Sequence, residues 1–491
     1  MNQQEVKPTI AFINTPTQLY SCENVSNAEK YSTIPPLGLG YVATAACEVV
    51  PKSNITFVDA EHLRLSPKKI IQTIIGSNPD YVAINATTPN WHIAKNIIIG
   101  IQKAINCRII IGGSHSILAS DSILKDSDIN HLIFFICIGD GEPTIVNLLK
   151  DKDLSQIPNI KYIDKDNNIV QTNNEVTRQF KNMIIDRSFF LNDPLINGSK
   201  IESYVLSARG CPYKCSFCAA PVISQTFVQR ESNSIKKELK ELLSQGVNYI
   251  RFIDDLFLSS KKRLNELQQI WIELGLSETN FGFEATARTN IAHSYSDATW
   301  AILVDMGLIE IEIGIESGSQ RILVLMSKRT NNKEVIKTVS MAISHGIKVK
   351  GFLMLGYPTE TIKDLEKTYE LARELKAIGG NSIRFSPVIV KAYPGTAIYD
   401  KYFHLVDSLY SDYLLDITKY FTQIFSEHEK NILKNRTRYN AVHTYKNNPV
   451  SLSEMTGGAK LDDVITYLAK IILISENQES GVELQKNAIS V

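Results

Sequence analysis

The chain has 491 residues, which is too many for one hydrophobic core, so we expect two or three domains. Lys+Arg and Asp+Glu each number 52, and this zero net charge gives no electrostatic reason to expect nucleic acid or an anionic membrane as a partner. The polar start has no signal-peptide pattern, and no apolar run approaches the ~20 residues that span a bilayer. We therefore expect a cytoplasmic protein with no membrane partner.

Residues 1–165 alternate short apolar strands with helical patterns, which is typical of a doubly wound, Rossmann-like parallel sheet. The predicted strands lie at residues 8–13, 55–59, 81–85, 108–111 and 132–138. Helical patterns lie between them, for example at residues 39–49 and 93–105. Such sheets bind ligands at the carboxyl ends of their strands.

The carboxyl ends of these strands carry small, polar and flexible residues. Glycine lets backbone approach a ligand closely, and hydroxyls near helix starts suit phosphates and amides. Each turn alone is most simply a plain βα loop, but four such turns in register favour a binding crevice. The candidate residues are Thr15, Pro16, Thr87, Thr88, Gly112, Gly113, Ser114, His115, Gly139, Gly141 and Glu142.

Residues 166–200 are polar and irregular and are interpreted as an interdomain linker, whose pair Phe189-Phe190 is expected to pack against one domain. A buried strand is then predicted at residues 204–208, directly before Cys211, Cys215 and Cys218. The three cysteines have Cx3CxxC spacing, and unrelated packing does not explain so tight a group.

Soft thiolates at this spacing favour zinc or an iron–sulfur cluster. A structural zinc site takes four ligands, commonly as two separated pairs, whereas here a triplet stands without a second pair. A [4Fe–4S] cluster held by three cysteines leaves one iron open to a small molecule. The other four cysteines, Cys22, Cys47, Cys107 and Cys137, are scattered, which indicates a reduced protein without a disulfide scaffold.

Residues 201–400 contain six βα units, which suggests a partial (β/α)6 barrel of the TIM type that is open on one side. Its later strands are predicted at residues 249–253, 281–285, 309–313, 348–354 and 382–385. Polar residues again follow the strands, where they are either helix-start carboxylates and rim ion pairs or ligand-binding groups. These candidates are Asp254, Asp255, Glu284, Arg288, Glu316 and Ser317.

Residues 401–491 are predicted to form a helical C-terminal cap over the open side of the barrel. Helical periodicity runs over residues 405–415, 421–433 and 461–474. The tail from about residue 475 is expected to be disordered.

The triplet, with Phe217 before its last cysteine, closely resembles the signature of radical S-adenosylmethionine (SAM) enzymes. The resemblance implies that Cys211, Cys215 and Cys218 bind a [4Fe–4S] cluster whose fourth iron binds SAM. Reductive cleavage of SAM would then give a 5′-deoxyadenosyl radical, with an electron donor such as flavodoxin or ferredoxin as a partner. Gly314-Ile315-Glu316-Ser317 resembles the family's GIES segment, and the resemblance implies that the SAM-binding residues are Phe217, Asp254, Asp255, Glu284, Arg288, Glu316 and Ser317.

The N-terminal region resembles the cobalamin (B12)-binding domain of one radical SAM subgroup. Residues 35–41 are similar to its PPLGLGY segment, which adds Leu37 and Gly38 to the candidates, and Gly112-Gly113-Ser114-His115 resembles its GGPHA turn. The Asp-x-His-x-x-Gly segment is missing after the first strand. If cobalamin binds, the resemblance therefore implies a base-off form without that histidine ligand, with His115 near the nucleotide tail more readily than on cobalt.

These features predict a cobalamin-dependent radical SAM methyltransferase. The favoured reaction is methylation of an unactivated carbon in a small molecule or peptide, through the deoxyadenosyl radical and methylcobalamin. Alternatives are a cyclase or rearrangement enzyme without net methyl transfer, and a methylase of a nucleophilic carbon or phosphorus centre. A methylthiotransferase and a non-enzymatic cluster or cobalamin sensor are disfavoured. The sequence names neither a catalytic residue nor the substrate.

Overall fold

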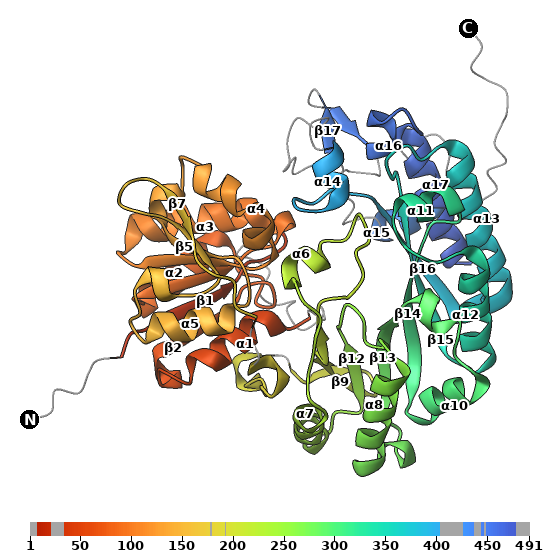
Figure 1. Cartoon of the computed structure of the whole chain (residues 1–491), viewed down its shortest axis with the longest axis horizontal. Coiled ribbons are helices and arrows are strands. Elements are labelled where there is room, and N and C mark those ends of the chain that lie inside the picture. Colours follow the sequence, from red (N-terminus) through yellow and green to blue (C-terminus); the bar gives the residue numbers. More distant parts are fainter. Residues whose placement is uncertain are drawn as a thin grey trace, which may run out of the picture. The chain divides into compact units, whose positions relative to one another are not determined.

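The computed structural model describes residues 7–20, 34–176, 179–191, 193–402, 426–436, 443–445 and 448–477. The chain divides into two compact units. The first comprises Met1–Pro212 and Ala219–Asp255, and the second comprises Tyr213–Cys218 and Leu256–Val491. The two units are described separately below, with labels as in Figure 1.

The first unit is built on a seven-stranded sheet of order β2-β1-β3-β4-β5-β6-β7. The strands are β1 (Ile10–Asn14), β2 (Ile55–Asp59), β3 (Tyr81–Asn85), β4 (Arg108–Gly112), β5 (Ile133–Cys137), β6 (Ile160–Ile163) and β7 (Ile169–Gln171). β1 to β5 are parallel, as predicted, and β6 and β7 add an antiparallel edge. The expected domain boundary at residue 165 therefore falls between β6 and β7.

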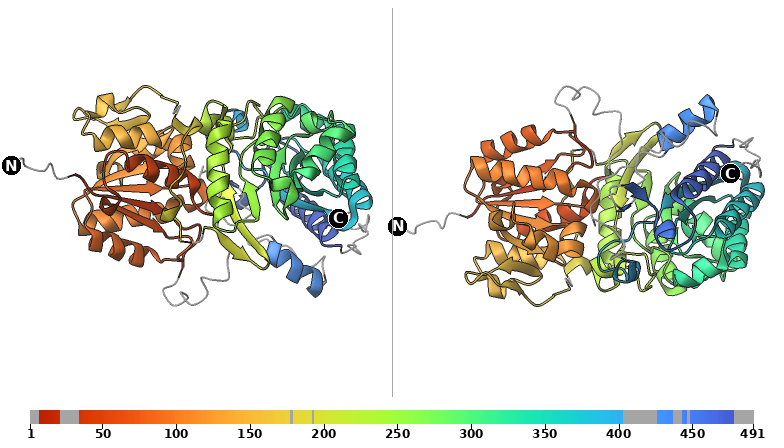
Figure 2. Two further views of the ribbon diagram at one scale, coloured as in Figure 1. Left: turned by 90° about the horizontal axis from the view of Figure 1, so that it is seen from below. Right: turned by 90° about the horizontal axis from the view of Figure 1, so that it is seen from above.

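Helices cover both faces of this sheet, as Figure 2 shows. α1 (Leu37–Ala46) and α5 (Gly141–Leu149) pack on the face that carries Phe12 and Phe135. α2 (Pro67–Ser77), α3 (Trp91–Ala104) and α4 (Ser114–Lys125) pack on the face that carries Ile13 and Ile111. The doubly wound fold predicted for this region is confirmed.

The region up to residue 255 contains β8 (Leu195–Asn197), β9 (Lys200–Val205), β10 (Ala208–Arg209), α6 (Ala220–Ser224), β11 (Val228–Gln229), α7 (Ser232–Ser244) and β12 (Tyr249–Phe252). Phe189 and Phe190 pack against Phe57, with ring centroids 5.4 and 5.9 Å away, so the linker is anchored to the first sheet. The strand predicted at residues 204–208 begins earlier and ends at Val205, because Ser207 turns its backbone N–H to the Asp254 carboxylate at 2.7 Å.

The second unit continues the βα alternation. Its parallel strands are β13 (Gly282–Ala287), β14 (Leu308–Glu316), β15 (Lys348–Leu355) and β16 (Ile383–Ile389). Its helices are α8 (Lys261–Glu273), α9 (Thr289–Ala292), α10 (Asp297–Asp305), α11 (Gln320–Leu325), α12 (Asn332–Ser344), α13 (Ile362–Gly379) and α14 (Ala397–Tyr402). In the first unit β9 and β12 also pair in parallel, so each of the six strands predicted for the partial barrel is present.

The period of two along β14 separates two faces. Ile311, Ile313 and Ile315 are fully buried on one face, and Glu310, Glu312 and Glu316 lie on the other. On the neighbouring β13, Phe283 packs against Trp271 of α8 at 5.4 Å between ring centroids. The apolar core of this unit therefore lies between its strands and helices.

The C-terminal part contains α15 (Glu427–Arg436), β17 (His443–Tyr445), β18 (Asn448–Val450), α16 (Leu452–Met455) and α17 (Leu461–Ser475). α17 matches the helix predicted at 461–474 and packs on α13 and β16. The helix predicted at 405–415 and the tail from residue 478 lie outside the described residues. Of the helix predicted at 421–433, residues 421–425 lie outside them and the rest largely coincides with α15. None of the described helices is long and apolar enough to cross a membrane.

A buried glutamate holds the turn that follows β15. The backbone N–H groups of Gly356 and Tyr357 donate to Glu360 Oε2 at 2.5 and 3.1 Å, and Ala459 donates to the Glu360 carbonyl at 2.7 Å. Glu360 is completely buried, and its Oε1 has no hydrogen-bond partner in the described part of the chain. Burial raises the pKa of this carboxyl to about 8, although the two N–H donors act in the opposite direction.

Glu360 should make stability fall as pH rises from about 4.5 towards 8. The unfolded chain ionises this group near its ordinary pKa, whereas the folded chain keeps it protonated, so folding is disfavoured increasingly over that range. Relative to wild type, Glu360→Gln should gain about 2–4 kcal/mol in the free energy of unfolding between pH 5 and pH 8. Urea denaturation at both pH values measures this gain, with Glu370→Gln on the exposed face of α13 as the control. Parallel pH profiles for wild type and Glu360→Gln would contradict the prediction.

Candidate functional site

The first unit contains a cavity of 310 Å³ between its sheet and the helices α1 and α5. Apolar side chains of four strands form its floor: Phe12, Ala83, Ile110 and Phe135. Leu37, Gly38, Leu39 and Val42 of α1 form one wall, and the turns after β4 and β5 form the mouth. The cavity therefore lies at the carboxyl ends of the parallel strands, where the sequence predicts a ligand.

Glycines keep the cavity open. A Cβ atom added at Gly38 or Gly112 would have no atom within 4 Å and would project into empty space. Gly113 has φ +96°, and a Cβ there would come within 2.4 Å of the Ala86 carbonyl oxygen, so this turn admits only glycine. An apolar slot with a backbone-lined polar mouth suits a flat heterocycle that carries a polar tail, and the residues present therefore fit the nucleotide end of cobalamin.

The structure brings eight of the predicted cobalamin residues to this cavity: Leu37, Gly38, Gly112, Gly113, Ser114, Gly139, Gly141 and Glu142. Thr15, Pro16, Thr87, Thr88 and His115 do not line it. Thr87 begins a short 3-10 turn whose Asn90 side chain accepts its backbone N–H at 2.7 Å. These five residues belong to the same strand ends, where four of them are buried and Thr87 is half-buried.

His115 is fully buried. Its ring lies on Trp91, with centroids 4.7 Å apart, and its Nδ1 is 3.2 Å from the Thr88 hydroxyl. No histidine is among the cavity-lining residues in the described part of the chain. Neither observation supports a nitrogen ligand from His115 to cobalt.

Sequence reasoning missed several cavity residues. Asn85 and Asp140 belong to the predicted strand-end turns but were not among the candidate residues, and Cys137 is the last residue of β5. Arg209, Ile223 and Ser224 flank the cysteine triplet and are far from the first sheet in sequence. Only the three-dimensional fold shows that they line this cavity.

The cysteine triplet lies in a loop whose ends are joined. β10 and β11 pair antiparallel, with Arg209 opposite Val228, and Gly210 (φ +78°) passes so close to Thr226 that a Cβ would lie 2.5 Å from its carbonyl oxygen. Cys211 belongs to the first unit, and Cys215 and Cys218 belong to the second. None of these three cysteines is in a disulfide, which fits a set of soft ligands for a cluster.

Arg288 contacts a cluster-loop cysteine directly. Its Nη1 lies 3.3 Å from Cys215 Sγ, and its guanidinium stacks 3.9 Å from the ring centroid of Tyr213. Its Nη2 donates to the Lys328 carbonyl oxygen at 2.5 Å, and its Nε donates to Asn290 Oδ1 at 3.1 Å. A buried guanidinium therefore lies directly beside one sulfur of the triplet, where its positive charge complements a metal-bound thiolate.

Glu316, the last residue of β14, is tied to Lys328. The Lys328 ammonium lies 2.5 Å from Glu316 Oε1, and both side chains are buried. Glu316 has φ +64°, and this strained backbone turns its carboxylate over Gly314, where any Cβ would lie 2.2 Å from Oε1. The sequence analysis did not single out Lys328, whose partner lies twelve residues earlier.

Ser317 and Phe217 are engaged in packing. The Ser317 hydroxyl is fully buried and lies 3.1 Å from the Thr368 hydroxyl of α13. Phe217 is half-buried against the apolar cluster that contains Ile322, Met326 and Ile398. Both residues hold the cluster loop and the GIES-like turn in place.

The two adjacent carboxylates after β12 have different surroundings. Asp254 is buried and accepts hydrogen bonds from both the backbone N–H and the hydroxyl of Ser207, at 2.7 and 2.5 Å. Asp255 is exposed, and its carboxylate accepts a hydrogen bond from the backbone N–H of Gly210, the residue before Cys211. Asp255 is therefore the better placed of the two to meet a ligand.

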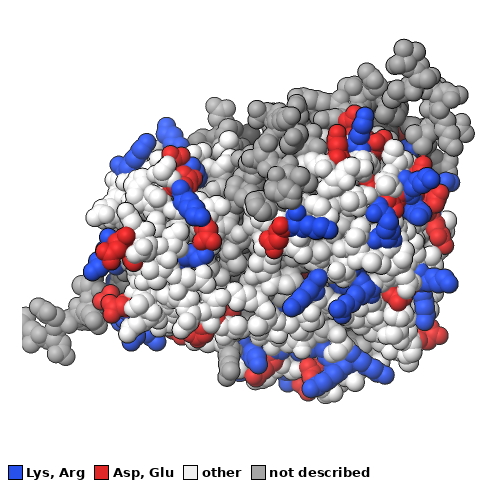
Figure 3. Space-filling view, turned by 45° about the horizontal axis from the view of Figure 1, so that its top comes forward, with Lys and Arg blue, Asp and Glu red and all other residues white. Residues whose placement is uncertain are grey.

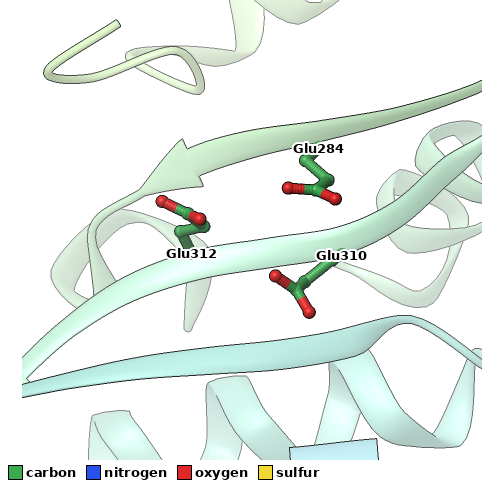
Figure 4. A group of neighbouring side chains, drawn as sticks. All are labelled: Glu284, Glu310 and Glu312. Carbon is green, nitrogen blue, oxygen red and sulfur yellow. The ribbon is translucent and has the colours of Figure 1, made fainter. Parts of the chain in front are cut away.

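Glu284 lies away from Arg288 and Glu316. It stands opposite Glu310 on β14, and its carboxylate gathers within 4.8 Å of those of Glu310 and Glu312 (Figure 4). Arg384 binds Glu310 through two N–H groups at 3.0 and 2.5 Å, and Lys350 binds Glu312 at 2.8 Å. Because cross-strand cations already compensate two of these carboxylates, we assign the cluster to the strand ladder.

Family models match two parts of the chain. The radical SAM superfamily model matches residues 205–372, and the B12 binding domain model matches residues 24–149. The chain is thus an enzyme of the radical SAM class. It belongs to the subgroup with an N-terminal cobalamin-binding domain, and its cofactors are a [4Fe–4S] cluster, SAM and cobalamin.

Similar proteins support this assignment. The chain is 27% identical to an uncharacterized methyltransferase of Pyrococcus horikoshii over 75% of this chain and 78% of that protein. It is 24% identical to the anaerobic magnesium-protoporphyrin IX monomethyl ester cyclase of Cereibacter sphaeroides, over 73% of this chain and 60% of that protein. The fold resembles that of the radical SAM methyltransferase TsrM of Kitasatospora setae, with TM-score 0.62, 16% identity, and coverage of 80% of this chain and 75% of TsrM.

Replacing Lys328 should weaken SAM binding. Lys328→Met leaves the buried Glu316 carboxylate without its cation and removes the constraint on its position, so we expect at least a tenfold loss of SAM affinity with cobalamin binding unchanged. Titration of reconstituted protein with SAM, followed by the change in the electron paramagnetic resonance (EPR) spectrum of the reduced cluster, measures this loss. The matched control is Lys350→Met, which breaks the Lys350–Glu312 pair of the same sheet. Equal SAM affinity in wild type and folded Lys328→Met would refute the assignment.

Protein loaded with cob(II)alamin should show no nitrogen superhyperfine splitting in its EPR spectrum. The reason is that His115 is buried against Trp91 and Thr88 and does not line the cavity. The spectrum should be the same in His115→Ala, with free base-on cob(II)alamin as the positive control. A nitrogen splitting in wild type that disappears in His115→Ala would show that His115 ligates cobalt.

Proposed function

We propose that this protein methylates an unactivated carbon of a small molecule or peptide in a cobalamin-dependent radical SAM reaction. The observation that carries the proposal is the open, glycine-lined cavity of the first unit. The same chain also places the Arg288 guanidinium beside the Cys215 sulfur of the cysteine triplet. When bound, the cluster and SAM supply a 5′-deoxyadenosyl radical, and cobalamin supplies a methyl group.

The proposed ligand sets follow from these contacts. Cys211, Cys215 and Cys218 hold the cluster, and Asp255, Arg288 and Glu316 bind SAM. Eight predicted residues, together with Asn85, Asp140 and Arg209, form the cobalamin cavity.

The protein's own contribution is to bind and orient these groups. The apolar floor of the cavity excludes water from a bound heterocycle, and its glycine turns bring backbone N–H groups to the mouth. Arg288 keeps positive charge at the Cys215 sulfur, and Lys328 pairs with the Glu316 carboxylate and fixes its position. These roles position reactants and require no further catalytic side chain in the described residues.

A second candidate is radical cyclisation or rearrangement without net methyl transfer. It is favoured by the similarity to the Cereibacter sphaeroides cyclase, which extends over nearly as much of this chain as the similarity to the Pyrococcus horikoshii protein. The described cysteines argue against a methylthiotransferase activity, because Cys47 caps the end of α1 and Cys107 precedes β4 at the opposite edge of the sheet. A sensor would not need the buried Lys328–Glu316 pair.

Charge and redox chemistry bear on the partners. Lysine, arginine, aspartate and glutamate are interspersed on the face drawn in Figure 3, without a single-sign surface of the kind that binds nucleic acid. We propose a small-molecule or peptide substrate, and a flavodoxin or ferredoxin as the electron donor. The described cysteines form no disulfide, which suits the reducing cytoplasm.

The test uses anaerobically reconstituted protein with cobalamin, SAM and a strong reductant. We expect bound cobalamin, 5′-deoxyadenosine and S-adenosylhomocysteine, and transfer of a deuterated methyl group from labelled SAM to a compound in a cell extract. Cys211→Ala should abolish 5′-deoxyadenosine formation. The cyclase alternative predicts 5′-deoxyadenosine without S-adenosylhomocysteine or labelled product.

Gly112→Leu should lower cobalamin retention at least tenfold, because its side chain would enter the open space of the cavity. Gly76→Leu is the control, since Gly76 of α2 also has open space around it but does not line the cavity. Cobalamin retained equally by both variants would mean that the cofactor does not use this cavity.

A further inference from the structure

One arginine extends from the neck of the cluster loop into the cobalamin cavity. Arg209 is the last residue of β10, and its pairing with Val228 closes the loop of residues 210–227 that carries all three cysteines. Its side chain leaves this neck and lines the cavity. Cys211 follows only two residues later.

The guanidinium of Arg209 is firmly held there. Its Nη2 donates to Glu142 Oε1 at 2.6 Å, and its Nη1 lies 3.6 Å from Asp140 Oδ1. It also stacks on Phe180 and Tyr41, at 4.1 and 5.0 Å from the ring centroids. The Glu142 side chain is only 1% exposed and stands in the first turn of α5, where the helix dipole favours a carboxylate.

The other flank of the cluster loop reaches the same cavity. Ile223 and Ser224 of α6, which follows Cys218, line it alongside Arg209. The segment that carries the cysteines therefore contributes to the cavity wall from both of its ends. Anything that fixes the wall also restricts the conformations of the loop, and anything that fixes the loop shapes the wall.

We propose that the Arg209–Glu142 pair is a positioning contact that couples cobalamin binding to assembly of the cluster in the loop of residues 210–227. The proposal rests on the proposed function, because it takes the cavity as the cobalamin site and the triplet as the cluster site. Coupling between two binding sites is reciprocal. If the cluster orders the loop and raises the affinity for cobalamin by some factor, bound cobalamin raises the affinity for the cluster by the same factor. The Arg209–Glu142 ion pair is suited to this role because the Glu142 side chain is almost fully buried. If the loop is misplaced, Arg209 moves away and the buried Glu142 carboxylate loses the cation that compensates its charge.

The test is a binding cycle with four measurements. The dissociation constant of hydroxocobalamin is measured for cluster-free and for cluster-reconstituted protein, in wild type and in Glu142→Gln. We expect wild type to bind about tenfold more tightly with the cluster than without it, and Glu142→Gln to show a ratio near one. If a substitution weakens hydroxocobalamin binding equally in cluster-free and cluster-reconstituted protein, the ratio of the two dissociation constants does not change. Simple damage to the cavity therefore cannot produce the expected result.

Asp126→Asn is the matched control. It makes the same carboxylate-to-amide change in a part-buried ion pair of the same domain, with Lys95 at 2.7 Å, and Asp126 does not line the cavity. This variant should keep the wild-type ratio. If Glu142→Gln does not fold, Arg209→Lys serves instead, because lysine keeps the charge but loses the planar geometry of the guanidinium.

A ratio near one in wild type, or an unchanged ratio in the folded variant, would overturn the coupling. Either result is distinct from failure of the proposed function, which would appear as no cobalamin binding to wild type in either state. A second readout is the rate of cluster loss in air, which bound cobalamin should slow several-fold in wild type and in Asp126→Asn but not in Glu142→Gln.

Discussion

Parallel strand pairing in register is the constraint on which both candidate sites depend. Asn14, Asp59, Asn85 and Gly112 end adjacent strands and are paired with one another, so the turns that follow open at one edge of the sheet. In the second unit the same geometry places Arg288 and Glu316 just after or at the ends of β13 and β14. Strand pairing alone therefore brings residues that are far apart in the chain to the same end of the sheet.

The fold was largely predictable because it is encoded locally. Apolar runs of strand length alternate with helical periodicity, and the predicted strands of both sheets match the observed ones within a few residues. The glycines of the cavity mouth were also predictable, since Gly112 ends a strand where a larger side chain would fill open space, and Gly113 follows it in a backbone conformation that favours glycine. The helix at 461–475 could be predicted from its continuous apolar face.

The partners of individual side chains were not predictable from the sequence. Thr88 and His115 follow strands just as Ser114 does, yet they contact each other while Ser114 lines the cavity. Asp254 and Asp255 are chemically identical neighbours, yet Asp254 is buried against the backbone N–H and hydroxyl of Ser207 while Asp255 is exposed. Arg209 and Lys328 meet their partners, Glu142 and Glu316, only because turns and strand register bring these residues together. No periodicity in the sequence indicates either ion pair.

The strands β13 to β16 carry ion pairs on one face, the face that partial barrels turn inward. On the other face, isoleucine, phenylalanine and tryptophan side chains pack against the helices. Glu310 with Arg384 and Glu312 with Lys350 replace the branched apolar layers that fill a closed barrel. The free energy that holds this unit together therefore comes mainly from the strand–helix side. Changes that replace both partners of an ion pair together alter the charge and shape of this face without leaving a buried charge uncompensated, and they leave the apolar strand–helix packing intact.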